Sequence, residues 1–125
     1  MGMNNFVVIE SEYGKFIVNR HCDYQAESLI KTGWPHIQEE LAKILTLVGR
    51  LPENSIVVDA GANIGLVAIP IAQAIAQKRG IVHAFEPQRI ISYALAGAAA
   101  LNDLENIVVH AKAVGASVGM VGVPK

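Results

Sequence analysis

An alternation of short apolar runs with longer helix-like segments, from Ser55 onward, constrains the fold most strongly. The apolar runs cover residues 56–58, 81–85 and 107–109, and the segments between them, 64–78 and 88–101, have helical character. Connections of this kind are short and right-handed, so they place successive strands in a parallel sheet with helices packed on it. The first run is continuously apolar, which is typical of a strand buried on both faces. The pattern predicts an α/β fold built on a β-α-β-α-β unit.

Two further elements are predicted ahead of this unit. Apolar runs at 6–9 and 15–18 flank a turn-like segment, which is typical of a β-hairpin. Pro35 suits the first turn of a helix whose apolar face recurs down to Val48 and which ends at Gly49. We therefore expect one compact domain made of a hairpin-and-helix lead-in, residues 1–50, and the β-α-β-α-β unit, residues 51–125.

Composition and charge narrow the possible partners. The 125 residues suffice for one domain, and 52% hydrophobic against 17% charged residues argues against disorder. A net charge of −1 predicts no nucleic-acid partner, because such binders carry a marked basic excess.

A single cysteine, Cys22, excludes an internal disulfide and favours a reducing, cytoplasmic setting. The N-terminus lacks a signal-peptide pattern, and the longest apolar segment, 64–75, is shorter than the roughly 20 residues that cross a bilayer, which predicts no membrane partner.

The loop that follows the first of these strands is the first candidate site. Asp59 lies at the carboxyl end of the strand, where open α/β sheets bind ligands. Gly61 permits a sharp turn, and Asn63 is among the few non-glycine residues that adopt a left-handed backbone readily. Gly65 permits a close approach of helix and strand, or of backbone and ligand. The segment from 59 to 65 therefore predicts a ligand-binding loop.

Glu86 is the second candidate site residue. It lies at the carboxyl end of the next predicted strand, 21 residues after Gly65. An acidic residue about 20 residues beyond a glycine loop binds the ribose hydroxyls in nucleotide-binding units. A carboxylate such as Asp59 would repel a pyrophosphate and attract a cation. The charge pattern therefore favours S-adenosylmethionine as the cofactor over NAD.

In these two motifs, 59–65 and 84–87, the chain resembles the FkbM-type S-adenosylmethionine-dependent methyltransferases. The resemblance continues through the segments 13–16, 23–24, 28–29, 33–34, 101–107 and 113–115. It implies a partial Rossmann-like parallel sheet of the S-adenosylmethionine methyltransferase type. It also implies site roles: the methionine end of the cofactor is lined by Asp59, Gly61, Asn63 and Gly65, and Glu86 holds the ribose. Members of that family methylate an oxygen of a sugar or natural-product acceptor, which implies a small-molecule substrate here.

The chain departs from that family at its end. It stops at Lys125, soon after the third predicted parallel strand, whereas the family's domain continues with strands that carry most of the substrate pocket. We therefore expect a truncated methyltransferase for which no catalytic base can be named. The strand 56–59 would then be an exposed apolar edge, through which we expect two copies to associate as a homodimer.

Two other functions remain open at this point. One is a non-catalytic methyltransferase-like remnant, or a nucleotide-binding module, that dimerises. The other is a fragment of an NAD-type oxidoreductase, which Asp59 disfavours. The histidines, His21, His36, His83 and His110, have no metal-ligand spacing, so no metal site is predicted. We expect His83 to be a sheet residue and His110 to lie near the adenine position.

Overall fold

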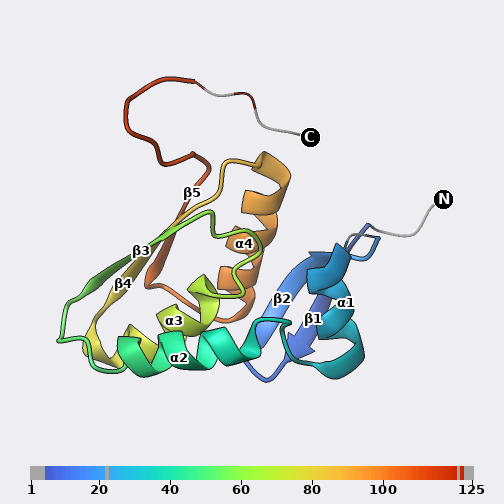
Figure 1. Ribbon diagram of the computed structural model, residues 1–125, viewed down its shortest axis with the longest axis horizontal. Coiled ribbons are helices and arrows are strands. Elements are labelled where there is room, and N and C mark those ends of the chain that lie inside the picture. The colour runs from blue at the N-terminus through green and yellow to red at the C-terminus, as the bar shows by residue number, and fades with distance from the viewer. Residues whose placement is uncertain (1–4, 22, 121, 123–125) are drawn as a thin grey trace.

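The computed structural model describes residues 5–21, 23–120 and 122, so Cys22 lies outside the described part (Figure 1). In chain order the elements are β1 Phe6–Ser11, β2 Gly14–Asn19, α1 Asp23–Thr32, α2 Gln38–Val48, β3 Ile56–Ala60, α3 Ala68–Ile75, the 3₁₀ helix η1 Ala76–Lys78, β4 Ile81–Phe85, α4 Arg89–Leu101 and β5 Ile107–His110. The first two strands form an antiparallel hairpin, and the others form a parallel sheet in the order β3-β4-β5. This confirms the predicted α/β fold, its hairpin and its β-α-β-α-β unit.

Among the residues that the structure describes, helices cover one face of the parallel sheet and leave the other face open. Successive right-handed crossovers that step in one direction bring α3 and α4 to the same side, as Figure 1 shows. On that side Val82 is 0% exposed, whereas Ile56, Val58 and Val108 on the opposite face are 67%, 59% and 42% exposed. The prediction that the run 56–58 is buried on both faces is therefore wrong. Within the described sheet β3 pairs only with β4, so the other edge of β3 is open.

The helix predicted over 64–78 begins only at Ala68. Asn63 and Gly65 have φ values of 52° and 97°, which lie in the left-handed region and cannot continue a right-handed helix. Pro70 is the third residue of α3. In the first turn of a helix a backbone N–H has no acceptor within the helix, so a proline at this position removes no helical hydrogen bond. The extra residues lengthen the loop that joins β3 to α3.

Helix α1 is not predicted by the hydrophobic pattern of the lead-in. Among its described side chains Leu29 is 1% exposed, while its neighbour Ile30 is 52% exposed. Among residues 27–32 adjacent apolar side chains thus differ in burial, and no apolar stripe recurs at helical spacing. Helix α2 begins at Gln38, three residues later than Pro35, which is itself buried in the preceding turn. In residues 5–21, 23–120 and 122, no helix has the length and apolar character that a membrane crossing requires.

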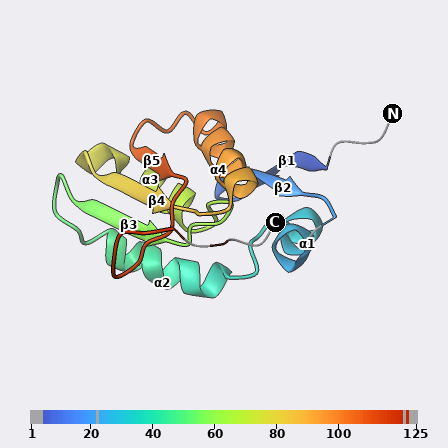
Figure 2. The same ribbon diagram turned by 90° about the horizontal axis from the view of Figure 1, so that it is seen from above.

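The hairpin packs on α4, which lies between β2 and the parallel sheet (Figure 2). Asn102, at the end of α4, pairs with the backbone of Lys15 on β2. Its Oδ1 accepts the Lys15 N–H at 2.9 Å, and its Nδ2 donates to the Lys15 carbonyl oxygen at 2.8 Å. The same Nδ2 also donates to the Ala98 carbonyl oxygen at 2.8 Å. The side-chain amide of Asn102 thus pairs with the backbone of β2 as a neighbouring strand would. It joins the lead-in to the β-α-β-α-β unit.

Replacing Asn102 with alanine is expected to lower the free energy of unfolding by about 1–3 kcal/mol, because partly buried backbone groups of Lys15 lose their partners. Urea unfolding followed by circular dichroism measures this change. Asn19→Ala is the matched control, since the Asn19 side chain accepts one exposed, local hydrogen bond from the His21 N–H. An equal loss in both variants would contradict the role assigned to Asn102.

Candidate functional site

The loop of residues 61–67 follows β3 in the chain and forms hydrogen bonds with the carboxyl end of β4. The N–H groups of Gly61 and Ala62 both donate to the carbonyl oxygen of Phe85 at 2.9 Å. The N–H of Asn63 donates to Oε1 of Glu86, also at 2.9 Å. Parallel strands end at the same edge of a sheet, which is why residues so far apart in the sequence meet here. The loop backbone is therefore fixed by the neighbouring strand.

Two glycines give this loop its shape for different reasons. Gly61 has φ of 78°, and a Cβ added there would meet nothing within 4 Å, so only the backbone conformation requires glycine. Gly65 has φ of 97°, and a Cβ there would lie 2.7 Å from Leu95 Cδ1 and 2.8 Å from Ile69 Cγ1. Gly65 thus permits close packing of the loop against α3 and α4. Apolar side chains fill the space beside it.

Asp59 is a site residue whose carboxyl group lies in an unfavourable electrostatic environment. Its Oδ2 is buried and has no hydrogen-bond partner among the described residues. Burial raises the pKa of this carboxyl above its ordinary value, and the neighbouring charge of Glu86 raises it further. A buried polar atom without a partner costs free energy in the ligand-free protein. A cationic or hydrogen-bond-donating ligand would satisfy it.

Glu86 lies at the end of the adjacent strand but has a different environment. It is only 4% exposed. Its Oε1 accepts the N–H of Asn63, and its Oε2 accepts the N–H of Gln88 at 2.9 Å. Glu86 therefore orders both the loop after β3 and the start of α4. Each carboxylate oxygen keeps a further lone pair, so hydroxyl groups of a ligand could still be accepted.

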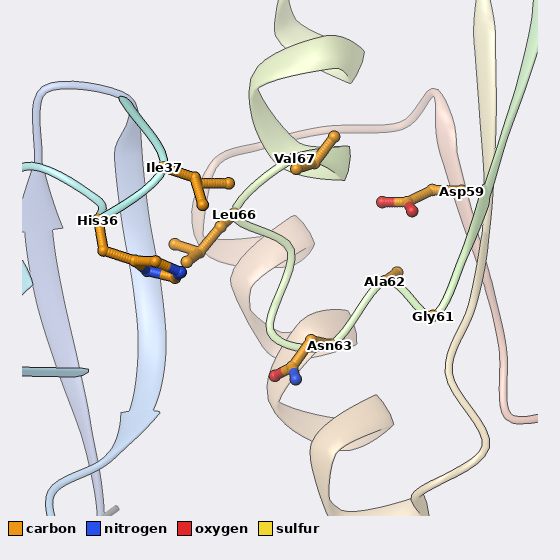
Figure 3. A pocket seen from close by; sticks show the side chains of 8 residues that line it. All are labelled: His36, Ile37, Asp59, Gly61, Ala62, Asn63, Leu66 and Val67. Carbon is orange, nitrogen blue, oxygen red and sulfur yellow. The ribbon is translucent and has the colours of Figure 1, made fainter. Parts of the chain in front are cut away.

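A pocket of about 140 Å³ opens between the loop and the segment before α2 (Figure 3). Three of the residues predicted to bind the cofactor, Asp59, Gly61 and Asn63, line it, whereas Gly65 and Glu86 do not. The other lining residues are His36, Ile37, Ala62, Leu66 and Val67. His36 is not among the residues predicted to bind the cofactor, because nothing in its local spacing places it near Asp59. Only the packing of α2 against α3 brings the two together.

Two other histidines meet on the open face of the sheet. Nδ1 of His83 lies 2.9 Å from Nε2 of His110, and the ring of Phe85 stacks on His110 with centroids 4.4 Å apart. His83 is thus a partnered sheet residue in this structure, as predicted, while the position of His110 near an adenine stays a prediction. No group of three or more His, Cys, Asp or Glu side chains within the described residues could hold a metal ion.

This chain matches solved structures in fold, but sequence searches find no related family or curated protein. No protein-family model matches the chain, and no curated protein matches it either. M. jannaschii TYW2 in complex with AdoMet matches with a TM-score of 0.57 and 20% identity, over 87% of this chain and 44% of that one. A SAM-dependent O-methyltransferase from Thermotoga maritima matches at 0.56 and 16% identity, over 85% and 40%. The complex of aTrm5 and tRNALeu matches at 0.60 and 18% identity, over 87% and 29%.

These matches show a shared fold, that of S-adenosylmethionine-dependent methyltransferases. The chain spans less than half the length of each of these proteins. The net charge led to the prediction that nucleic-acid partners are excluded. This exclusion is wrong, because aTrm5 shares the fold and its structure is a complex with tRNALeu. A net charge is a sum over the chain, so it does not exclude such a partner for a protein with this fold.

Proposed function

We propose that this chain is the cofactor-binding part of an S-adenosylmethionine-dependent methyltransferase. The observation that carries the proposal is the buried, unpartnered Oδ2 of Asp59 at the wall of the pocket. The methionine end of S-adenosylmethionine has an ammonium group next to a sulfonium. An ammonium group would give Asp59 the charge-assisted hydrogen bond that it lacks in the ligand-free protein.

The remaining predicted site residues have roles consistent with this proposal. Gly61 and Asn63 line the pocket and would face the methionine end. Gly65 acts through the shape of the loop rather than by contact. Glu86 would accept the ribose hydroxyls on lone pairs that its two backbone hydrogen bonds leave available. The shared fold supports the proposal, as does TYW2, a neighbour in complex with AdoMet.

We further propose that the acceptor is a hydroxyl of a sugar or natural product. The resemblance to FkbM-type enzymes in 59–65 and 84–87 supports this, and one structural neighbour is an O-methyltransferase. When bound, S-adenosylmethionine supplies a sulfonium methyl group, whose carbon–sulfur bond breaks as the acceptor oxygen attacks in line. The part of this chain around Asp59 would orient the donor for that attack. The acceptor proton passes to a base that we do not assign to any described residue.

Calorimetry on the intact chain tests the proposal. S-adenosylmethionine and S-adenosylhomocysteine are expected to bind at a single site, and NAD is expected not to bind. A preference for NAD, or no binding of S-adenosylmethionine, would contradict it. Transfer of a labelled methyl group to a panel of hydroxylated acceptors then separates an enzyme from a binding module. Binding without transfer to any acceptor would favour the non-catalytic alternative.

A further inference from the structure

The pocket beside Asp59 has a polar group on each side and apolar side chains between them. Asp59 projects from the end of β3, His36 projects from the segment before α2, and Leu66 and Val67 lie between (Figure 3). Its volume of about 140 Å³ is below the range of about 300–1,000 Å³ found for pockets that hold whole small-molecule ligands. The pocket therefore has the size of one end of a cofactor, and not of the whole molecule.

An amino-acid end presents two opposite charges on one carbon atom, an ammonium and a carboxylate. Asp59 can bind only the ammonium, so the carboxylate needs N–H donors elsewhere. The backbone of the loop offers few, because five successive N–H groups already donate within the protein: those of Gly61, Ala62, Asn63, Ile64 and Gly65. A side chain of the pocket can therefore supply part of the carboxylate site, beside the N–H groups of Leu66 and Val67.

Two of the eight lining residues, His36 and Asn63, have side-chain N–H donors, and none of the eight is a lysine or arginine. Asn63 lies on the loop itself, and its Oδ1 already accepts the N–H of Ile64 at 2.9 Å. The imidazole of His36 extends toward the pocket from the side opposite Asp59 (Figure 3). An imidazole carries an N–H group at Nδ1 or Nε2, according to its tautomer, and such a group is a donor that a carboxylate can accept.

We propose that His36 binds the carboxylate of the methionine end of S-adenosylmethionine while Asp59 binds its ammonium group. This inference rests on the proposed function and extends it to a residue of the lead-in. The lead-in thereby becomes part of the cofactor site: docking of α2 against α3 supplies one of the two polar contacts on which the amino-acid end depends.

The test compares three ligands by calorimetry on wild type and His36→Ala: S-adenosylmethionine, its decarboxylated form, which keeps the ammonium, and 5′-methylthioadenosine, which lacks both groups. His36→Ala is expected to weaken S-adenosylmethionine about 10- to 100-fold and to leave the other two within about twofold. His21→Ala is the matched control, because His21 is exposed and lies outside the pocket lining. It is expected to change none of the three.

The outcomes separate this inference from the proposed function. An equal loss for all three ligands would assign His36 a structural role, and no loss for S-adenosylmethionine would show that the carboxylate binds elsewhere. Either result overturns the inference while the proposed function stands. If wild type binds neither S-adenosylmethionine nor 5′-methylthioadenosine, the proposed function fails, and the inference fails with it. Because His36 is exposed, its replacement is expected to leave the unfolding midpoint unchanged.

Discussion

Replacing Asp59 with asparagine is expected to weaken S-adenosylmethionine binding about 100-fold and, in the same variant, to raise the stability of the ligand-free protein. The loss of binding follows because the amide is neutral, so its hydrogen bond to the ammonium group lacks the ion pairing that the carboxylate provides. The gain in stability follows because a buried, unpartnered carboxylate oxygen destabilises the folded state. Solvent screens part of this charge, so we expect a gain of about 0.5–1 kcal/mol.

The stability difference between Asp59→Asn and wild type should depend on pH. The folded pKa of Asp59 is raised above its ordinary value of 3.8 by burial and by the charge of Glu86. A raised carboxyl pKa means that the folded protein binds the proton more tightly than the unfolded chain does. Wild type therefore loses stability relative to the variant as pH rises above about 3.8, until pH passes the folded pKa and the difference becomes constant.

Urea unfolding at several pH values, together with calorimetry, checks both effects. Asp103→Asn is the matched control, because Asp103 is exposed and asparagine also accepts its positive φ of 53°. The control is expected to change neither binding nor stability appreciably. If Asp59→Asn bound S-adenosylmethionine as wild type does, Asp59 would have no role in the cofactor site. A loss of stability in this variant would show that its carboxylate is partnered in solution.

Gly65→Ala should be far more destabilising than Gly61→Ala, although both residues have positive φ. Alanine at either position costs about 1–2 kcal/mol from the left-handed backbone. At Gly65 the new Cβ would also lie 2.7 Å from Leu95 Cδ1 and 2.8 Å from Ile69 Cγ1, and overpacking of this kind adds about 1–3 kcal/mol. At Gly61 the Cβ would meet nothing within 4 Å.

Equilibrium unfolding of the two glycine variants measures this difference directly. A second substitution tests the cause, because Leu95→Ala in the Gly65→Ala background removes the side chain nearest to the added methyl group. We expect this double variant to lose less stability than the sum of the two single changes. Equal losses for Gly65→Ala and Gly61→Ala would mean that backbone strain alone requires glycine at 65.

The sequence alone predicts the parts of the site that depend on local pattern. Apolar runs separated by helical segments lead to a parallel sheet, and parallel strands end at the same edge. Asp59 and Glu86, each at the end of such a run, are therefore expected to be neighbours, and Glu86 contributes to the raised pKa of Asp59. The left-handed loop conformation also follows from residue types, because Gly61, Asn63 and Gly65 are residues that adopt it readily.

Other features depend on contacts between distant segments, and no local pattern encodes them. An apolar run does not show whether one or two faces of a strand are covered, so the exposure of Ile56 and Val58 emerges only from the placement of α3 and α4. Residue spacing likewise predicts neither the pairing of Asn102 with Lys15 nor the approach of His36 to Asp59. In this protein the sequence determines the strands, the glycine loop and its acidic residues, because backbone preference and strand periodicity act over a few residues. Tertiary structure decides which side chain faces Asp59 and which sheet face stays open, because both depend on how whole elements pack.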